Sequence, residues 1–293
     1  MNGDEQIRCA VLKMMTAAVT MLALALTACS DDGGGDPGSE PSTMADGGTD
    51  DTASAQEALT AAVRAMDQES LGLRYEMRLD GTAAITIDGV QDRDGDWSAT
   101  ARFDDPSDAS EPAAMDARSS AGSVWMTMRS WPAPDNGCWL EIPRGQTPVG
   151  ISGLLPDELA YARVLSALHA LDFEPGSTTG ISGEIDLRVA LSLVQSQALA
   201  EVEIDPARIR GTRVPATIEL RDGQVAEVTM TGGSLLDTFG RIRAPLSAQA
   251  YQALKIIDYQ VSYTSPATDA VLPPPADGLV LTPAESESRA GCR

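Results

Sequence analysis

Apolar and polar side chains alternate with a period of two through residues 71 to 103, which is the pattern of strands with one buried face. The apolar positions form three groups: Leu71, Leu73, Tyr75, Met77 and Leu79; Ala83, Ile85 and Ile87; Trp97, Ala99, Ala101 and Phe103. Because the residues between them are mostly polar, the pattern predicts a meander of antiparallel strands that share one apolar face.

Further strands are predicted downstream of this meander. Val124, Met126 and Met128 alternate once more, and a short strand is expected at 138–142 within a turn-rich stretch. Alternation returns in Ile185, Leu187 and Val189, in Val202 and Ile204, and finally in Ile257, Tyr259, Val261 and Tyr263.

Two segments have helical spacing instead. Leu59, Ala62, Val63 and Met66 predict an amphipathic helix over 54–69, with Ser54 as its N-cap. A second helix is predicted over 156–171, where Tyr161, Val164, Leu165, Leu168 and Leu171 form a stripe. Pro156 at its first position and the acidic first turn favour this start.

The stretch VPATIELRDGQVAEVTM, residues 214–230, predicts a β-hairpin. A two-residue turn at Asp222 and Gly223 would place Val228 and Met230 on the wrong face. A three-residue loop that includes Arg221 pairs Ala216 with Val228 and keeps the apolar residues together, so we prefer it. The sum of these elements is an α+β protein, a long antiparallel sheet with two or three helices to cover its apolar face.

The N-terminal region reads as an export signal. Arg8 and Lys13 precede an apolar run over 14–28, which is shorter than the roughly 20 residues that span a membrane. The end of this run, Leu26-Thr27-Ala28-Cys29, resembles the lipobox of bacterial lipoproteins. The alternative is an ordinary secretory signal with a coincidental cysteine.

The lipobox resemblance implies that residues 1–28 are removed and that Cys29 carries a diacylglycerol. Two acyl chains suffice for stable anchoring, so we expect the protein on the outer, extracytoplasmic face of the cell membrane. Residues 29–52 are rich in Gly, Asp, Ser, Pro and Thr, which predicts a disordered acidic tether. No internal boundary follows, so residues 53–293 are interpreted as a single domain.

The formal net charge is −22. Such an acidic surface repels phosphate backbones and anionic headgroups, which excludes nucleic acid as a partner and a basic patch as the membrane anchor.

The order of elements resembles the actinobacterial LppX/LprG-type lipoproteins, whose fold is similar to LolA and LolB. The resemblance rests on the lipobox, on LGLRYEMRLDG after the first helix, on LPDELAYARVLSALHALDFEPG and on ISGEIDLRV. It continues in the hairpin and in YQVSYTSPATDAVLPPPAD, and it departs at Thr217 and Ile218, where such families often carry an aromatic residue.

This resemblance implies a curved half-barrel sheet, covered on its concave side by helices, that holds a lipid or glycolipid for transport through the cell envelope. An acyl chain in water costs about 0.8 kcal/mol per exposed methylene, so a carrier needs an apolar container. The expected cavity residues are Leu73, Tyr75, Met77, Ile85, Ile87, Trp97, Phe103, Met126, Met128, Leu165, Leu168, Leu187, Val189, Ala216, Ile218, Val228 and Met230.

Two alternatives stay open at this point. The apolar face could be a packed core, because alternation does not separate a filled interior from an empty one. The protein could then be an envelope interaction or sensor module that binds a protein partner, for example through Trp125, Trp131 and Trp139.

Signals for catalysis and for a cofactor are missing from the sequence. His169 is the single histidine and has no second ligand at metal-binding spacing, and there is no nucleophile elbow, P-loop or dinucleotide fingerprint. We therefore expect neither an enzyme nor a metal or cofactor site. Of the four cysteines, Cys9 leaves with the signal and Cys29 is lipidated, so Cys138 and Cys292 are predicted to form a disulfide in the oxidising envelope.

Overall fold

The computed structural model describes residues 49–67, 69–103, 113–128, 139–142, 160–194, 206–276 and 280–281. Its strands are β1 Leu71–Leu79, β2 Thr82–Gln91, β3 Trp97–Phe103, β4 Ala113–Ser120, β5 Ser123–Met128, β6 Trp139–Ile142, β7 Leu168–Phe173, β8 Gly180–Asp186, β9 Arg213–Arg221, β10 Gln224–Thr231, β11 Ile257–Thr264 and β12 Val280–Leu281. Its helices are α2 Thr49–Met66, α3 Ala160–Ser166, α4 Leu187–Leu193, α6 Pro206–Ile209, α7 Gly232–Arg241 and α8 Ala248–Lys255.

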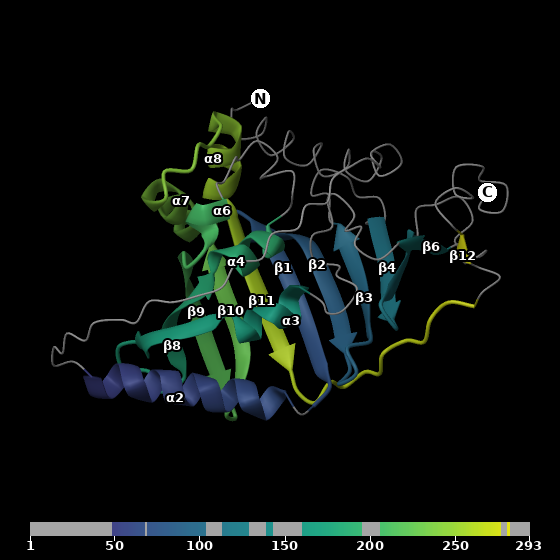
Figure 1. Ribbon diagram of the computed structural model, residues 1–293, viewed down its shortest axis with the longest axis horizontal. Coiled ribbons are helices and arrows are strands. Elements are labelled where there is room, and N and C mark those ends of the chain that lie inside the picture. Colours follow the sequence, from purple (N-terminus) through teal and green to yellow (C-terminus); the bar gives the residue numbers. More distant parts are fainter. Residues whose placement is uncertain are drawn as a thin grey trace.

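All twelve strands form one sheet, in the order β12-β6-β5-β4-β3-β2-β1-β11-β10-β9-β8-β7. Every neighbouring pair is antiparallel except β12 and β6, which run parallel. The sheet is curved and does not close on itself, and the helices gather over and beside its β7 to β11 half (Figure 1). The α+β fold class predicted from the pattern is confirmed.

Strand β1 shows why these segments are strands. Leu73, Tyr75 and Met77 are buried on the face that we call the inner face, while Arg74 and Arg78 point to the opposite, outer face. The same alternation holds in β3 and in β11, where Ile257, Tyr259, Val261 and Tyr263 are all buried. The pairing of β1 with β2 contains a bulge, because Met77 is opposite Ile85 but Arg78 is opposite Ala83. Ala84 is buried at this bulge, whereas the pattern predicts Ala83 on the apolar face.

Three hairpins turn through two residues that both have positive φ. They are Asp80-Gly81, Ala121-Gly122 and Asp222-Gly223. This backbone conformation is that of a type I′ turn, which matches the twist of paired strands.

The preferred three-residue loop of the β9–β10 hairpin is therefore wrong. Arg221 pairs with Gln224 across a two-residue turn, and a bulge between Val225 and Glu227 then shifts the register. As a result Ile218 pairs with Val228, and both keep the inner orientation that the hydrophobic pattern requires.

Helix α2 begins at Thr49, inside the predicted tether, and not at Ser54. Its sequence contains neither Gly nor Pro, so no residue between Thr49 and Ser54 disfavours the earlier start. Its buried side chains, Ala55, Leu59, Ala62 and Met66, belong to the core. The helix packs against β7 and β10, and Gln56 accepts a hydrogen bond from the backbone N–H of Ala170 in β7 at 3.0 Å.

The helix predicted over 156–171 is only partly correct. Helix α3 ends at Ser166, and Leu168 and Leu171 belong to edge strand β7. Pairing with β8 supplies the backbone hydrogen bonds there, and a bulge at Leu171 leaves that side chain 44% exposed. Leu187 and Val189, predicted as strand, lie in helix α4, which packs on α3.

After β11 the chain crosses the outer face of the sheet. The N–H of Ala267 donates to the carbonyl of Ser70, the N–H of Leu272 donates to Ser98 Oγ, and Arg118 donates to the carbonyl of Pro273. We call residues 265–276 the strap. It leads toward β12, which pairs with β6 on the far side of the sheet (Figure 1).

Candidate functional site

The inner face of the sheet is the candidate site. Its buried side chains come from β1 to β5 and from β7 to β11 and form a single apolar cluster with those of α2, α3, α4 and α7. Within the described residues, the buried polar side chains other than tyrosines are Thr86, Ser98, Ser119 and Thr238, and none of the buried side chains is charged. The inner face therefore offers an uncharged, water-excluding surface.

The structure gathers most of the predicted cavity residues on this surface. Those that are buried are Leu73, Tyr75, Met77, Ile85, Ile87, Trp97, Met126, Leu165, Leu168, Leu187, Ile218, Val228 and Met230. Phe103, Val189 and Ala216 are partly buried and pack against the same cluster. Met128 lies in β5, but its side chain is outside the described part, as are Cys29, Cys138, Cys292, Trp131, Val202 and Ile204.

A cluster of tyrosines occupies the middle of the inner face. Four of the five tyrosines of the chain are buried there: Tyr75, Tyr161, Tyr259 and Tyr263. The ring of Tyr75 stacks on that of Tyr161 with centroids 4.5 Å apart, and its centroid lies 6.5 Å from that of Tyr259. The cluster thus joins α3 to the two central strands.

Two of the tyrosine hydroxyls tie helices to the sheet. Tyr75 donates to the carbonyl of Leu193 at 2.8 Å, which is the last residue of α4. Tyr263 donates to the carbonyl of Tyr161 in α3 at 2.7 Å. Tyr259 differs, because its hydroxyl is buried and finds no hydrogen-bond partner in the part of the chain that the structure describes.

Burial raises the pKa of Tyr75 well above its ordinary value, and it also raises the pKa values of Tyr161 and Tyr259. The phenolate would lose its hydration in this apolar setting, so the neutral form is favoured. All three side chains are therefore uncharged and able to donate at ordinary pH.

The sequence-based list of site residues omitted Tyr161, Tyr259 and Tyr263. Tyr259 and Tyr263 could have been included, because they fall on the apolar parity of the last predicted strand. Met115 and Ala117 of β4 were missed altogether, because Ala and Ser dominate that segment and give a weak alternation.

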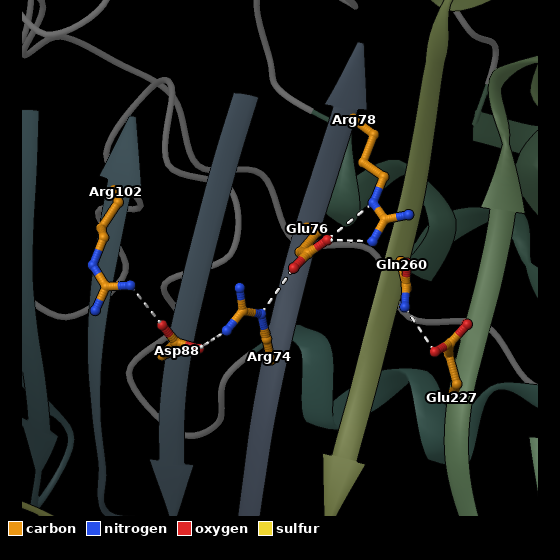
Figure 2. Close-up of polar contacts among 7 residues, drawn as sticks. All are labelled: Arg74, Glu76, Arg78, Asp88, Arg102, Glu227 and Gln260. Atoms are coloured by element: carbon orange, nitrogen blue, oxygen red, sulfur yellow. Dashed lines mark hydrogen bonds and ion pairs between the residues drawn. The ribbon is translucent and has the colours of Figure 1, made fainter. Parts of the chain in front are cut away.

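The outer face of the same strands carries a chain of charged side chains, which we call the outer ladder (Figure 2). Asp88 lies 3.3 Å from Arg102 and 3.6 Å from Arg74, and Arg74 in turn donates to Glu76 at 2.8 Å. Arg78 contacts the other oxygen of Glu76 at 2.7 Å.

The outer ladder changes the titration of its members. Although partial burial works to raise the pKa of Glu76, the hydrogen bonds from Arg78 and Arg74 outweigh it and lower that pKa. The bond to Glu76 raises the pKa of Arg74. Further along the same face, Gln260 donates to Glu227 at 2.7 Å (Figure 2).

Other places on the described surface are less suited to an acyl chain. A pocket of about 410 Å³ beside Arg213 and Arg241 is open and is lined largely by polar groups, including Glu184. His169 lies 3.2 Å from Asp186, which gives it a local partner. Among the described residues, no three potential ligands are grouped to hold a metal, and none of the helices is long and apolar enough to cross a membrane.

Two of the proposed partner-binding tryptophans lie in the described part. Trp139 is buried, with the guanidinium of Arg118 4.4 Å from the centre of its ring, so it is not available as an exposed contact. Trp125 is half-buried on β5.

Fold and site together define an α+β protein with an open antiparallel sheet and an uncharged, tyrosine-containing inner face. No family model matches the chain, and no curated protein matches its sequence. Among solved structures it is similar to the LolA superfamily protein NE2245 from Nitrosomonas europaea, at 12% identity and a TM-score of 0.27. The match covers 77% of this chain and 96% of that one. We draw no conclusion from a likeness of this degree, and the fold class rests on the strand order and register.

Proposed function

We propose that this protein is an exported lipoprotein that binds a lipid or lipidated glycoconjugate on the inner face of its sheet and carries it through the cell envelope. The observation that supports it is the inner face itself, an apolar surface built on an unclosed sheet and without a buried charge among the described residues. Burial of apolar surface contributes about 25 cal/mol per Å², so such a face can hold an acyl chain.

The proposal includes the finer points that the sequence predicts. Cys29 carries the acyl chains that hold the protein on the outer side of the membrane, and Cys138 and Cys292 form a disulfide. A Cys29→Ala variant should leave the membrane fraction for the soluble or secreted one. If the variant still sediments with membranes after a carbonate wash, the anchoring proposal is wrong.

A specific observation favours a second candidate. Most inner-face side chains are already nearly inaccessible, with Trp97, Ile181, Ile185 and Ile218 all at 0% exposure. This is what a filled core looks like, and it would suit an envelope module that binds a protein partner and no lipid.

Ala216 separates the two candidates. It is partly buried and packs against the core from β9, while its neighbour Thr217 is exposed on the other face. Ala216→Trp should block a lipid site while leaving the melting temperature nearly unchanged. In a filled core the same ring would overpack the interior and destabilise by about 1 to 3 kcal/mol.

Thr217→Trp is the matched control, since it adds the same ring to the outer face. Wild type and both variants are purified, extracted with organic solvent and examined by mass spectrometry, with melting curves in parallel. Lipid that co-purifies with wild type and with Thr217→Trp but not with Ala216→Trp supports the carrier. Wild type without lipid, together with a destabilised Ala216→Trp, would refute it.

A further inference from the structure

The Tyr259 hydroxyl is an exception within a well-satisfied cluster. Its side chain is 1% exposed and its oxygen has no hydrogen-bond partner among the described residues, whereas Tyr75 and Tyr263 both donate to helix carbonyls. A buried hydroxyl without a partner destabilises the folded state, and folded proteins leave few such groups. An unpaired donor in this position therefore suggests a partner that is not part of the chain.

The described residues that pair with Tyr259 in the sheet have mainly apolar side chains. Met77 and Met230 are opposite it on the two adjacent strands, and the ring of Tyr75 lies beyond. The two methionines and the Tyr75 ring supply apolar surface, and the Tyr75 hydroxyl is directed to the carbonyl of Leu193. Asp258 and Gln260, which flank Tyr259 in β11, point to the outer face.

The missing partner must also be neutral. None of the described buried side chains is charged, and the nearest arginines on β1, Arg74 and Arg78, are engaged with Glu76 on the outer face. A buried carboxylate or phosphate would thus have no counter-ion, and burying an unpaired charge is far more costly than burying a carbonyl. Burial raises the pKa of Tyr259, so its hydroxyl keeps the proton that it can donate.

We infer that the Tyr259 hydroxyl donates a hydrogen bond to the ester carbonyl of a bound acyl lipid, and that the protein selects ester-linked acyl chains. This inference rests on the proposed function and names the ligand class. The acyl chains contact the methionines and the tyrosine rings, and the ester carbonyl accepts a hydrogen bond from the Tyr259 hydroxyl, the unpaired donor of the inner face. A dialkyl ether lipid has the same chains but no carbonyl.

The test compares these two lipids directly. The protein is first delipidated and then loaded with a fluorescent phosphatidylcholine. Displacement of this probe is measured during titration with dipalmitoyl phosphatidylcholine or with its dihexadecyl ether analogue. Wild type should bind the ester lipid about three- to tenfold more tightly, which is what one neutral hydrogen bond contributes. Tyr259→Phe should reduce the ester affinity to that of the ether and leave the ether affinity unchanged.

Tyr75→Phe is the matched control. It removes the bond to the carbonyl of Leu193, so it should lower the melting temperature and keep the preference for ester. Tyr259→Phe should melt no lower than wild type without lipid, because its hydroxyl has no protein partner to lose.

The outcomes are distinct. If Tyr259→Phe keeps the full ester preference, or if it melts as low as Tyr75→Phe, the hydroxyl does not bind the ligand and this inference is wrong. If wild type binds both lipids equally, the inference also fails while lipid binding stands. If wild type binds neither lipid and releases none on extraction, the proposed function fails as well.

Discussion

The two faces of the central strands are built from the same backbone and stabilised by different forces. On β1, Tyr75 and Met77 are at most 2% exposed on the inner face, whereas the side chain of Arg74 is 52% exposed on the outer face. Full burial of a large apolar side chain contributes about 1.5 to 3 kcal/mol, and an exposed ion pair about 0.2 to 1 kcal/mol. The comparison teaches that burial on the inner face provides most of the stability of these strands, while the ion pairs of the outer face add little.

The largest contrast is expected at two adjacent residues of β3. Trp97 is fully buried on the inner face, so Trp97→Ala should cost about 3 to 5 kcal/mol. Ser98 lies on the outer face beneath the strap, and its hydroxyl accepts a hydrogen bond from the N–H of Leu272. Ser98→Ala should therefore lower the free energy of unfolding by only about 1 kcal/mol. Denaturant unfolding of both variants measures the difference. Equal costs would show that Trp97 does not pack as described.

A smaller contrast is expected in β8. A methyl group added at Gly183 would lie 2.6 Å from Cδ1 of Ile218 and 2.8 Å from the carbonyl oxygen of His169. Because one of these atoms is backbone, Gly183→Ala should destabilise by about 1 to 3 kcal/mol. Ser182 is exposed on the other face, and Ser182→Ala should change stability by less than about 0.5 kcal/mol. A neutral Gly183→Ala would mean that the inner face has room at this point.

The outer ladder predicts a pH dependence at Glu76. Its pKa is lowered in the folded state, so its contribution to stability is complete above the ordinary value of 4.5 and is lost as the pH falls through the folded-state pKa. Glu76→Gln should therefore cost about 1 kcal/mol at neutral pH and almost nothing in strong acid. Glu57→Gln, at an exposed position of α2, is the control and should have little effect throughout. A cost for Glu76→Gln that stays constant with pH would contradict the ladder.

The smallest effect is expected at Asp88, whose side chain is 39% exposed between Arg74 and Arg102. Asp88→Asn should cost about 0.2 to 1 kcal/mol at low salt, and the cost should vanish near 1 M salt, where charges are screened within about 3 Å. Unfolding at two salt concentrations measures it. A salt-independent loss would point to a packing role and would weaken the contrast between the faces.

The sequence was sufficient where a strand has one buried and one exposed face. Strands β1, β3 and β11 were predicted because alternation is the direct result of half-burial. The sequence did not predict the secondary structure correctly where contacts between distant segments determine it. Leu168 continues the helical spacing of Tyr161 and Leu165, yet pairing with Ile185 makes it part of β7.

Similar limits apply to the candidate site. The apolar face was predictable, because the parity of the strands fixes which side chains share it. The unpaired hydroxyl of Tyr259 was not, because its isolation depends on which groups face it from strands distant in sequence. The start of helix α7 does have a local sequence signal. Thr231 is its N-cap, and its side chain accepts a hydrogen bond from the N–H of Ser234, as Thr commonly does at a helix N-terminus.

An unclosed sheet also has an edge that could recruit other chains. The N–H and C=O groups of an outermost strand are a template for a further strand, and repeated addition produces polymers. In β7 the amide of Ala170 is already occupied by Gln56, and the bulge at Leu171 interrupts the regular spacing that an incoming strand needs. Helix α2 thus gives each molecule its own protection against edge-to-edge aggregation.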